Sequence, residues 1–144
     1  MEYVSRSVKE TERVAGELAR TFAGGECVAL HGNLGAGKTQ FTRGVVEALG
    51  GNPRAVSSPT FVLLNVYPGG RLTVYHLDAY RVSGPEDFEA IGFNELLDQG
   101  GVVVIEWASK VADLLPARII HVRLEPQDPS TRLITIENPS LRAV

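Results

Sequence analysis

The chain has 144 residues, a length that suits a single domain with a sizeable buried core, so we expect one domain over residues 1–144. Its composition is that of an ordinary globular protein, and the net charge of −3 argues against a broad basic surface for nucleic acid. The single cysteine, Cys27, excludes an intrachain disulfide and a cysteine metal cluster. Neither a membrane span of about 20 apolar residues nor a signal peptide is recognisable, so we expect no membrane association and a cytoplasmic location.

The first predicted element is a helix that begins after Ser7, because residues 7–10 read as a capping box. One face of this helix carries residues at helical spacing, namely Thr11, Ala15, Leu18 and Phe22. The pair Gly24–Gly25 is expected to end the helix. We expect it to pack beside the strand that follows, in which Cys27 is a buried and inert thiol.

A phosphate-binding loop is the strongest signal in the chain. Residues 32–39 match the pattern G-x-x-x-x-G-K-[ST], after an apolar strand at 27–31 and before a helix at 38–49. The glycines let the backbone wrap around phosphate with its N–H groups pointing inward, and the helix adds its positive N-terminal end. In this pattern Lys38 reaches the β- and γ-phosphates and the Thr39 hydroxyl reaches Mg²⁺. The sequence therefore predicts a nucleoside triphosphate site.

A hydroxyl-rich loop, Ser58-Pro59-Thr60, follows the helix-breaking residues 50–53. Pro59 holds the residue before it extended, so this segment is expected to be a loop that leads into a strand. Hydroxyls after the helix of a phosphate-binding loop can sense a γ-phosphate, as switch loops do. An ordinary Ser/Pro turn is the alternative that these residues leave open.

Two carboxylates each follow a predicted strand. Residues 61–67 and 72–77 read as an antiparallel hairpin, and Asp78 comes directly after it. Residues 102–105 are all β-branched, as in a buried central strand, and Glu106 follows them. Because ligands of open α/β sheets bind beyond the carboxyl ends of the strands, we expect both carboxylates and the loop to converge on one Mg-nucleotide. A turn-capping role is the alternative for Asp78.

The remaining segments predict a helical stretch and a second hairpin. Residues 83–97 read as one helix interrupted near Gly92 or as two short helices, and residues 111–115 as another short helix. Residues 119–124 and 133–137 alternate as a hairpin that completes the sheet. Together these elements predict an α/β fold of the P-loop NTPase type, a mixed and largely parallel sheet with antiparallel hairpins and flanking helices.

Several side chains near the predicted site have no assigned chemistry. Trp107 is expected to pack half-buried beside the site, and Arg132 to lie at the surface or to reach a nucleotide from the sheet margin. The histidines show no metal-ligand spacing, and we expect structural roles for His31, His76 and His121.

Four motifs occur in this order: the loop at 32–39, Ser58-Pro59-Thr60-Phe61, the run at 75–81 and Ile105-Glu106-Trp107. In this combination the chain resembles the bacterial TsaE (YjeE) family, the small ATPases of tRNA threonylcarbamoyladenosine biosynthesis, over nearly its whole length. The resemblance implies a weak, partner-dependent ATPase with Mg²⁺ and ATP or ADP as cofactors. It also implies two partners, the paralogous TsaB- and TsaD-like threonylcarbamoyl-transfer proteins. ATP hydrolysis would reset their complex, and tRNA would be met only through that complex.

The same resemblance implies roles for single residues. Lys38 binds phosphate, Thr39 and Glu106 hold Mg²⁺, and Asp78 is an acid of the Walker-B type at the metal. The serine-proline-threonine loop is the switch-like segment. The residues expected to bind ATP are Thr11, Asn33, Leu34, Gly35, Ala36, Gly37, Lys38, Thr39, Gln40 and Arg132. Asn33 stands where the family usually has aspartate, so a carboxylate role is in question there, but nucleotide binding is not.

We expect Mg-ATP hydrolysis in which Asp78 or Glu106 orients the attacking water, and the sequence leaves open which one does. No arginine is plainly placed as an intrinsic finger, although Arg43, Arg81 and Arg132 are candidates. Two alternatives are a small-molecule kinase and a nucleotide-gated binding module with incidental hydrolysis. A GTPase is disfavoured because no Asn-Lys-x-Asp motif occurs.

Overall fold

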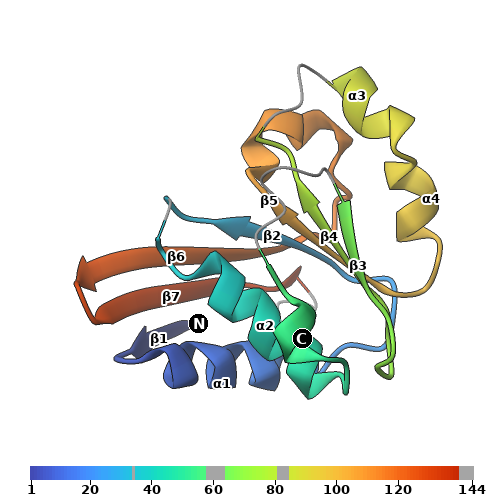
Figure 1. The fold of residues 1–144 in the computed structure, drawn as a ribbon. Coiled ribbons are helices and arrows are strands. Elements are labelled where there is room, and N and C mark those ends of the chain that lie inside the picture. Colours follow the sequence, from blue (N-terminus) through green and yellow to red (C-terminus); the bar gives the residue numbers. More distant parts are fainter. Residues whose placement is uncertain (34, 58–63, 81–84, 140–144) are drawn as a thin grey trace.

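One mixed sheet runs through the protein (Figure 1). The computed structural model describes residues 1–33, 35–57, 64–80 and 85–139, and in these residues seven strands follow the order β1-β7-β6-β2-β5-β4-β3. The strands are β1 (Glu2–Ser5), β2 (Cys27–His31), β3 (Leu64–Tyr67), β4 (Val74–Asp78), β5 (Val102–Glu106), β6 (Ile120–Asp128) and β7 (Thr131–Glu137). The helices are α1 (Val8–Ala19), α2 (Lys38–Ala48), α3 (Pro85–Ala90) and α4 (Phe93–Leu97), with 3₁₀ segments η1 (Pro53–Ala55) and η2 (Ala108–Leu114).

The centre of the sheet is parallel and both margins are antiparallel. Strand β2 pairs in parallel with β5 and β6, and β5 pairs in parallel with β4. The hairpins β3–β4 and β6–β7 are antiparallel, as their turn residues predicted. The predicted α/β class, with a mixed sheet, two antiparallel hairpins and flanking helices, is confirmed.

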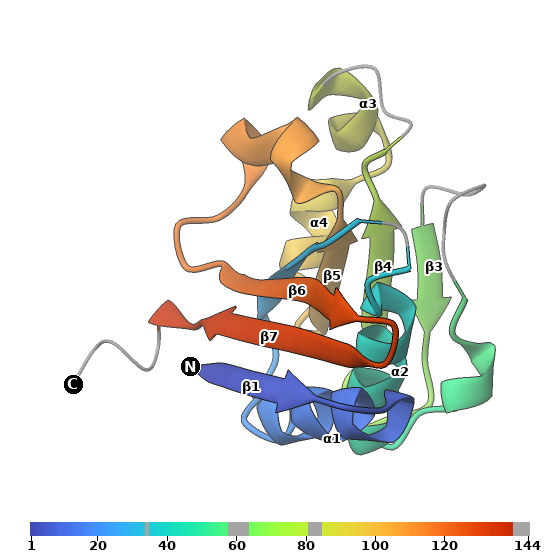
Figure 2. The same cartoon turned by 90° about the vertical axis from the view of Figure 1, so that its left-hand side faces the viewer.

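An N-terminal strand, β1, was not predicted. It pairs antiparallel with β7, with Tyr3 opposite Ile134, and it forms the edge of the sheet (Figure 2). The N-terminal ammonium of Met1 also donates a hydrogen bond of 3.0 Å to the carbonyl of Ile136. The strand could not be predicted because four residues are too few to show an alternating pattern. Its pairing partner, β7, lies near the other end of the chain.

Helices cover both faces of the sheet, α1 and α2 on one face and α4 with η2 on the other (Figure 1). The alternation along β5 shows this division, because Val102 and Val104 pack under α1 and α2 while Val103 and Ile105 pack under α4 and η2. Cys27 lies in the second of these cores, and burial raises the pKa of its thiol to about 12, as expected for an inert cysteine.

The first helix begins as predicted and ends earlier. Ser7 caps α1 by accepting a hydrogen bond of 3.1 Å from the backbone N–H of Glu10. The helix stops at Ala19 instead of running to the glycine pair, because the N–H groups of Thr21 and Phe22 bond to carbonyls three residues back and tighten the last turn. Phe22 is still buried, at 3% exposure, but it lies beyond the helix.

The other predicted helices are present with shifted ends. The stretch after β4 forms two short helices, α3 and α4, separated at Gly92, whose φ of 82° suits glycine. The short helix predicted at 111–115 is a 3₁₀ segment that starts at Ala108. In the part of the chain that the structure describes, no helix is both long and apolar enough to cross a membrane.

Candidate functional site

The glycine loop connects the end of β2 to the start of α2. Gly35 and Gly37 have φ of 80° and 107°, a left-handed conformation that side chains with a Cβ rarely adopt. Gly32 is required for a different reason, because a Cβ at this position would lie 2.9 Å from the Ala36 Cβ and 3.0 Å from the carbonyl oxygen of Leu124 on β6. The loop therefore lies directly against β6 and depends on glycine both for its turns and for this close approach.

Arg132 braces the loop from β7. Its guanidinium donates to the carbonyl oxygens of Ala36 and Gly35, each at 3.1 Å, and to the carbonyl oxygen of Asp128 at 3.2 Å. The planar fork of arginine suits this set of acceptors, which a lysine ammonium does not reproduce. Arg132 thus ties two loop carbonyls to the turn between β6 and β7.

A pocket of about 320 Å³ opens beside the loop, between the start of α1 and the β6–β7 turn. Five of the residues predicted to bind ATP line it, namely Thr11, Gly35, Gly37, Gln40 and Arg132. The Thr11 hydroxyl shares a hydrogen bond of 2.7 Å with the hydroxyl of Ser5, which fixes the wall of the pocket to β1. The pocket therefore joins residues from the two ends of the chain at one side of the loop.

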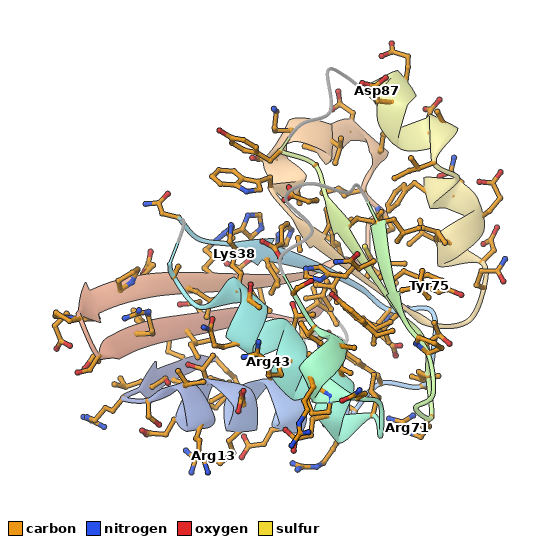
Figure 3. All side chains as sticks on the ribbon, viewed as in Figure 1. Arg13, Lys38, Arg43, Arg71, Tyr75 and Asp87 are labelled. Atoms are coloured by element: carbon orange, nitrogen blue, oxygen red, sulfur yellow. The ribbon has the colours of Figure 1, made fainter. Side chains whose placement is uncertain are left out.

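Lys38 lies in the first turn of α2 and points toward the carboxyl ends of the central strands (Figure 3). Its side chain is 6% exposed, its Nζ lies 3.7 Å from Glu106 Oε1, and the same atom lies 4.4 Å from the centre of the Trp107 ring. Trp107 has a φ of 57°, and its ring contacts that of Tyr80 at 5.0 Å between centroids. The lysine thus faces both a carboxylate and an aromatic ring.

Asp78 and Glu106 end adjacent parallel strands and are register neighbours. Each is 3% exposed, and Asp78 Oδ1 accepts a hydrogen bond of 2.7 Å from the N–H of Tyr80. Burial raises the pKa of Asp78, and the negative charge of Glu106 raises it further. The structure brings the two carboxylates and Lys38 together, as the spacing of the motifs predicted.

These groups suit a magnesium ion. The described residues contain no group of three or more His, Cys, Asp or Glu side chains that would bind a metal by themselves. Mg²⁺ usually takes one or two carboxylates and completes its shell with phosphate oxygens and water. Asp78 and Glu106 end adjacent strands, and Thr39 follows Lys38 in the first turn of α2, so these three side chains are the candidates for such an incomplete oxygen set. A divalent cation would also relieve the repulsion that raises the pKa of Asp78.

The sequence reasoning gave His76 no part in this site, but it contacts the site directly. Its ring is fully buried, its Nε2 lies 2.6 Å from Glu106 Oε2, and its Nδ1 lies 3.1 Å from the Tyr67 hydroxyl. A usable signal was present, because His76 and Asp78 are two residues apart in one strand and so face the same side of the sheet. Buried polar groups need hydrogen-bond partners, so two polar side chains on one face of a buried strand indicate a polar site there.

A second pocket, of about 490 Å³, is lined by Asn33, His31, Trp107 and Arg123 among others. Asn33 was predicted to bind ATP, but it lines this pocket and not the one beside Thr11. His31 Nε2 lies 2.9 Å from His121 Nδ1. Burial, with the charge of Arg123 adding to it, lowers the pKa of His31 to about 4, so this histidine is neutral near pH 7.

Some predicted site residues lie outside the described residues, namely Leu34, Ser58, Pro59, Thr60 and Arg81. Ala36 is fully buried beneath the loop, and its N–H bonds to the carbonyl of Asn33 at 3.0 Å. Arg43 pairs with Glu12 of α1 at 4.0 Å.

Comparison with known proteins supports one family. The sequence model described as "Threonylcarbamoyl adenosine biosynthesis protein TsaE" matches residues 5–134. Similar curated proteins, each named "tRNA threonylcarbamoyladenosine biosynthesis protein TsaE", come from Treponema pallidum and Rickettsia conorii. The Treponema protein is 43% identical over 136 residues, which is 94% of this chain and 99% of that protein. The Rickettsia protein is 39% identical over 130 residues, which is 90% of this chain and 74% of that protein.

The fold agrees with this family. The crystal structure of Bacillus subtilis YdiB superimposes with a TM-score of 0.80 at 29% identity, covering 99% of this chain and 87% of that one. A curated TsaE protein from the same organism is 36% identical over 127 residues, 88% of this chain and 78% of that protein. The glycine loop, the two strand-end carboxylates and these similarities lead to one conclusion: the chain belongs to the TsaE family of threonylcarbamoyl adenosine biosynthesis proteins.

Proposed function

We propose that this protein is an Mg²⁺-dependent ATPase that acts in tRNA threonylcarbamoyladenosine biosynthesis. The observation that carries the proposal is the meeting of Lys38 with Glu106, 3.7 Å apart in a nearly water-free setting at the end of the glycine loop. A buried lysine next to a buried carboxylate suits an ATP phosphate chain with its metal, because both charges then find partners in the bound state. The names of the relatives supply the biosynthetic setting.

The nucleotide is proposed to lie along the loop with its base and sugar in the pocket beside Thr11. Gly35, Gly37 and Gln40 line that pocket at the loop side, and Arg132 lines it at the opposite side. From there the phosphates would run over the loop toward Lys38, which serves as a point charge for the β- and γ-phosphates. Asn33 borders the other pocket, so we assign it to the phosphate loop and not to the base.

Thr39, Asp78 and Glu106 are the residues proposed to hold Mg²⁺. The ion, when bound, would neutralise charge on the transferred phosphoryl group. Lys38 and the loop amides act on the same charge from the protein side. Both oxygens of the Glu106 carboxylate have side-chain partners, one near Lys38 and the other on His76, whereas Asp78 Oδ1 accepts from the backbone N–H of Tyr80. We therefore assign water orientation to Asp78 and positioning of the metal to Glu106.

The activity is proposed to depend on two partners, the TsaB- and TsaD-like threonylcarbamoyl-transfer proteins, with hydrolysis resetting their complex. This role would set the protein in the cytoplasm, with tRNA met through the complex.

The test is ADP release from Mg-ATP by the purified protein, with and without both partners. We expect little release alone and a strong rise with the partners, and Lys38→Ala should abolish ATP binding without changing the circular dichroism spectrum. An equal rate with and without partners would contradict partner dependence. Phosphate transfer to a metabolite in place of water would favour a small-molecule kinase. Full support of the partners by Asp78→Asn and Glu106→Gln, without hydrolysis, would favour a nucleotide-gated binding module.

A further inference from the structure

Behind the proposed metal carboxylate runs a chain of buried polar groups that belongs to three different elements. Glu106 ends β5, His76 lies in the middle of β4, and Tyr67 ends β3. Their contacts are Glu106 Oε2 to His76 Nε2 at 2.6 Å and His76 Nδ1 to the Tyr67 hydroxyl at 3.1 Å. Exposures of 3%, 0% and 5% show that water does not compete for these bonds.

The chain continues to the backbone of Ser57. The Tyr67 hydroxyl lies 3.1 Å from the Ser57 carbonyl oxygen and accepts a hydrogen bond of 3.4 Å from the Ser57 N–H. Tyrosine has one hydroxyl proton, and two acceptors lie within its reach, the Ser57 carbonyl and His76 Nδ1. The Tyr67 hydroxyl therefore contacts both the His76 ring and the backbone of Ser57.

A histidine held in this way is suited to orient a carboxylate. A carboxylate that binds a metal is ionised and only accepts hydrogen bonds, so in the role proposed for Glu106 the short contact carries its proton on His76 Nε2. With Nε2 bound to Glu106 and Nδ1 bound to Tyr67, the ring has no freedom to turn. One Glu106 oxygen is then held by His76, and the other is left facing Lys38, at 3.7 Å. Carboxylates that bind metals commonly depend on such outer partners.

We propose that His76, held by Tyr67, is a positioning residue that fixes the Glu106 carboxylate for Mg²⁺ and thereby for ATP hydrolysis. This inference rests on the function proposed above for Glu106, and it adds a residue that does not touch the nucleotide. The alternative is that His76 only fills the core between β4 and β5. The two differ in a measurable way, since a core-filling residue affects stability and all ligands alike, whereas a positioning residue affects the metal-dependent steps.

The test compares two substitutions of His76 that differ in reach. The amide nitrogen of glutamine occupies the position of the ring Nε2, whereas that of asparagine corresponds to Nδ1. His76→Gln therefore keeps a donor for Glu106, and His76→Asn loses it. His121→Gln is the matched control, because His121 is also a strand histidine bonded to a second side chain, that of His31. All variants are first compared with the wild type by thermal unfolding.

ADP affinity is measured by calorimetry in Mg²⁺ and in EDTA, and kcat and KM for ATP are measured with both partners present. We expect His76→Asn to lower kcat/KM and the Mg²⁺-dependent gain in ADP affinity by roughly 10- to 100-fold, with ADP affinity in EDTA within about twofold of wild type. His76→Gln should keep most of the wild-type kcat/KM and Mg²⁺-dependent gain in ADP affinity. Tyr67→Phe should lower both quantities, but by less than His76→Asn does. The proposal would be overturned if His76→Asn and His76→Gln gave the same kcat/KM and Mg²⁺-dependent gain in ADP affinity. It would also be overturned if His76→Asn lowered ADP affinity equally in Mg²⁺ and in EDTA.

A second measurement does not depend on the enzymatic activity. In the protein without nucleotide, ¹⁵N correlation spectra of the histidine rings should show a proton on His76 Nε2 in a strong hydrogen bond, and Glu106→Gln should shift that signal. An unchanged His76 signal would refute the contact and with it the positioning role. If the wild type with its partners released no ADP, the proposed function would fail, while these spectra and the ADP affinities would still decide the position of Glu106.

Discussion

Trp107 shows how the chain uses backbone strain at the site. Among the described residues it is the single non-glycine residue with a positive φ, 57°, a conformation that costs a bulky residue about 1–2 kcal/mol. The turn begins directly after Glu106 and places the indole face 4.4 Å from Lys38 Nζ. Such a residue persists where surrounding contacts hold it, which is common at functional sites. The indole therefore keeps Lys38 in place by a cation–π contact as well as shielding it from water.

The charge of Asp78 should reduce the stability of the nucleotide-free protein. Its pKa is raised in the folded state, so the folded protein binds this proton more tightly than the unfolded chain does, and stability falls as the pH rises through the folded pKa. Asp78→Asn keeps the acceptor for the Tyr80 N–H and removes the charge. We expect the variant in EDTA to melt at a higher temperature than wild type at pH 7 and to release less ADP.

The pH dependence of the melting temperature shows whether the buried charge of Asp78 causes the difference between Asp78→Asn and the wild type. At about pH 3, below the unfolded-state pKa of about 3.9, the wild-type carboxyl is mostly protonated in both states, so most of the difference in melting temperature should be lost there. Asp113→Asn is the matched control, since Asp113 is exposed and loses the same formal charge. A gain that persists unchanged at pH 3, or that appears equally in the control, would show that the buried charge is not the cause.

Arg132 should act on the loop through its fork of donors. Arg132→Lys keeps the charge but cannot bond the carbonyls of Ala36 and Gly35 together, and one lost bond to a charged group is worth ~1.5 kcal/mol. We expect ADP affinity, measured by calorimetry, to fall roughly 10-fold. Arg71→Lys is the control, because Arg71 also clasps a carbonyl, that of Phe22, far from the loop (Figure 3). Equal affinity in the two variants would remove the bracing role from Arg132.

At the scale of elements, the α1–α2 contact depends on one glycine. A Cβ on Gly44 of α2 would lie 2.4 Å from the carbonyl oxygen of Glu12 in α1, so the helices would have to separate. We expect Gly44→Ala to destabilise the protein by about 1–3 kcal/mol in urea unfolding, as overpacked cores do. Because α2 begins at Lys38, the displaced helix should also weaken ATP binding.

Gly16 of α1 provides the matched control. A Cβ there would meet the Ala48 Cβ at 3.5 Å, an ordinary contact, so Gly16→Ala should be neutral or stabilising by up to ~1 kcal/mol through its helix propensity. If both variants lost stability equally, the close approach at Gly44 would not explain the effect.

At the scale of the whole molecule, the local patterns predicted the parallel centre, the two hairpins and the strand ends that carry Asp78 and Glu106. Each of these features can be predicted from patterns within about ten residues of sequence, such as the periodicity of apolar residues and the residue types at turns. The features that sequence reasoning missed depend on distant pairs. The strand β1 exists because of β7, and His76 acquires its contact with Glu106 only when β4 and β5 align. The pairing of β1 leaves no local pattern, whereas the spacing of His76 and Asp78 is a local pattern that places both on one face but does not show that His76 meets Glu106.

The pairing of β1 with β7 has a consequence for the order in which the protein is made. On the ribosome β1 emerges long before residues 131–137, so it has no strand to pair with until the rest of the chain has been synthesised. The same delay applies to the pocket beside Thr11, whose opposite wall contains Arg132. Nascent chains that have not yet exposed β7 should therefore lack a finished nucleotide pocket, and the ability to capture ATP should arise late in synthesis, almost together with the completed sheet.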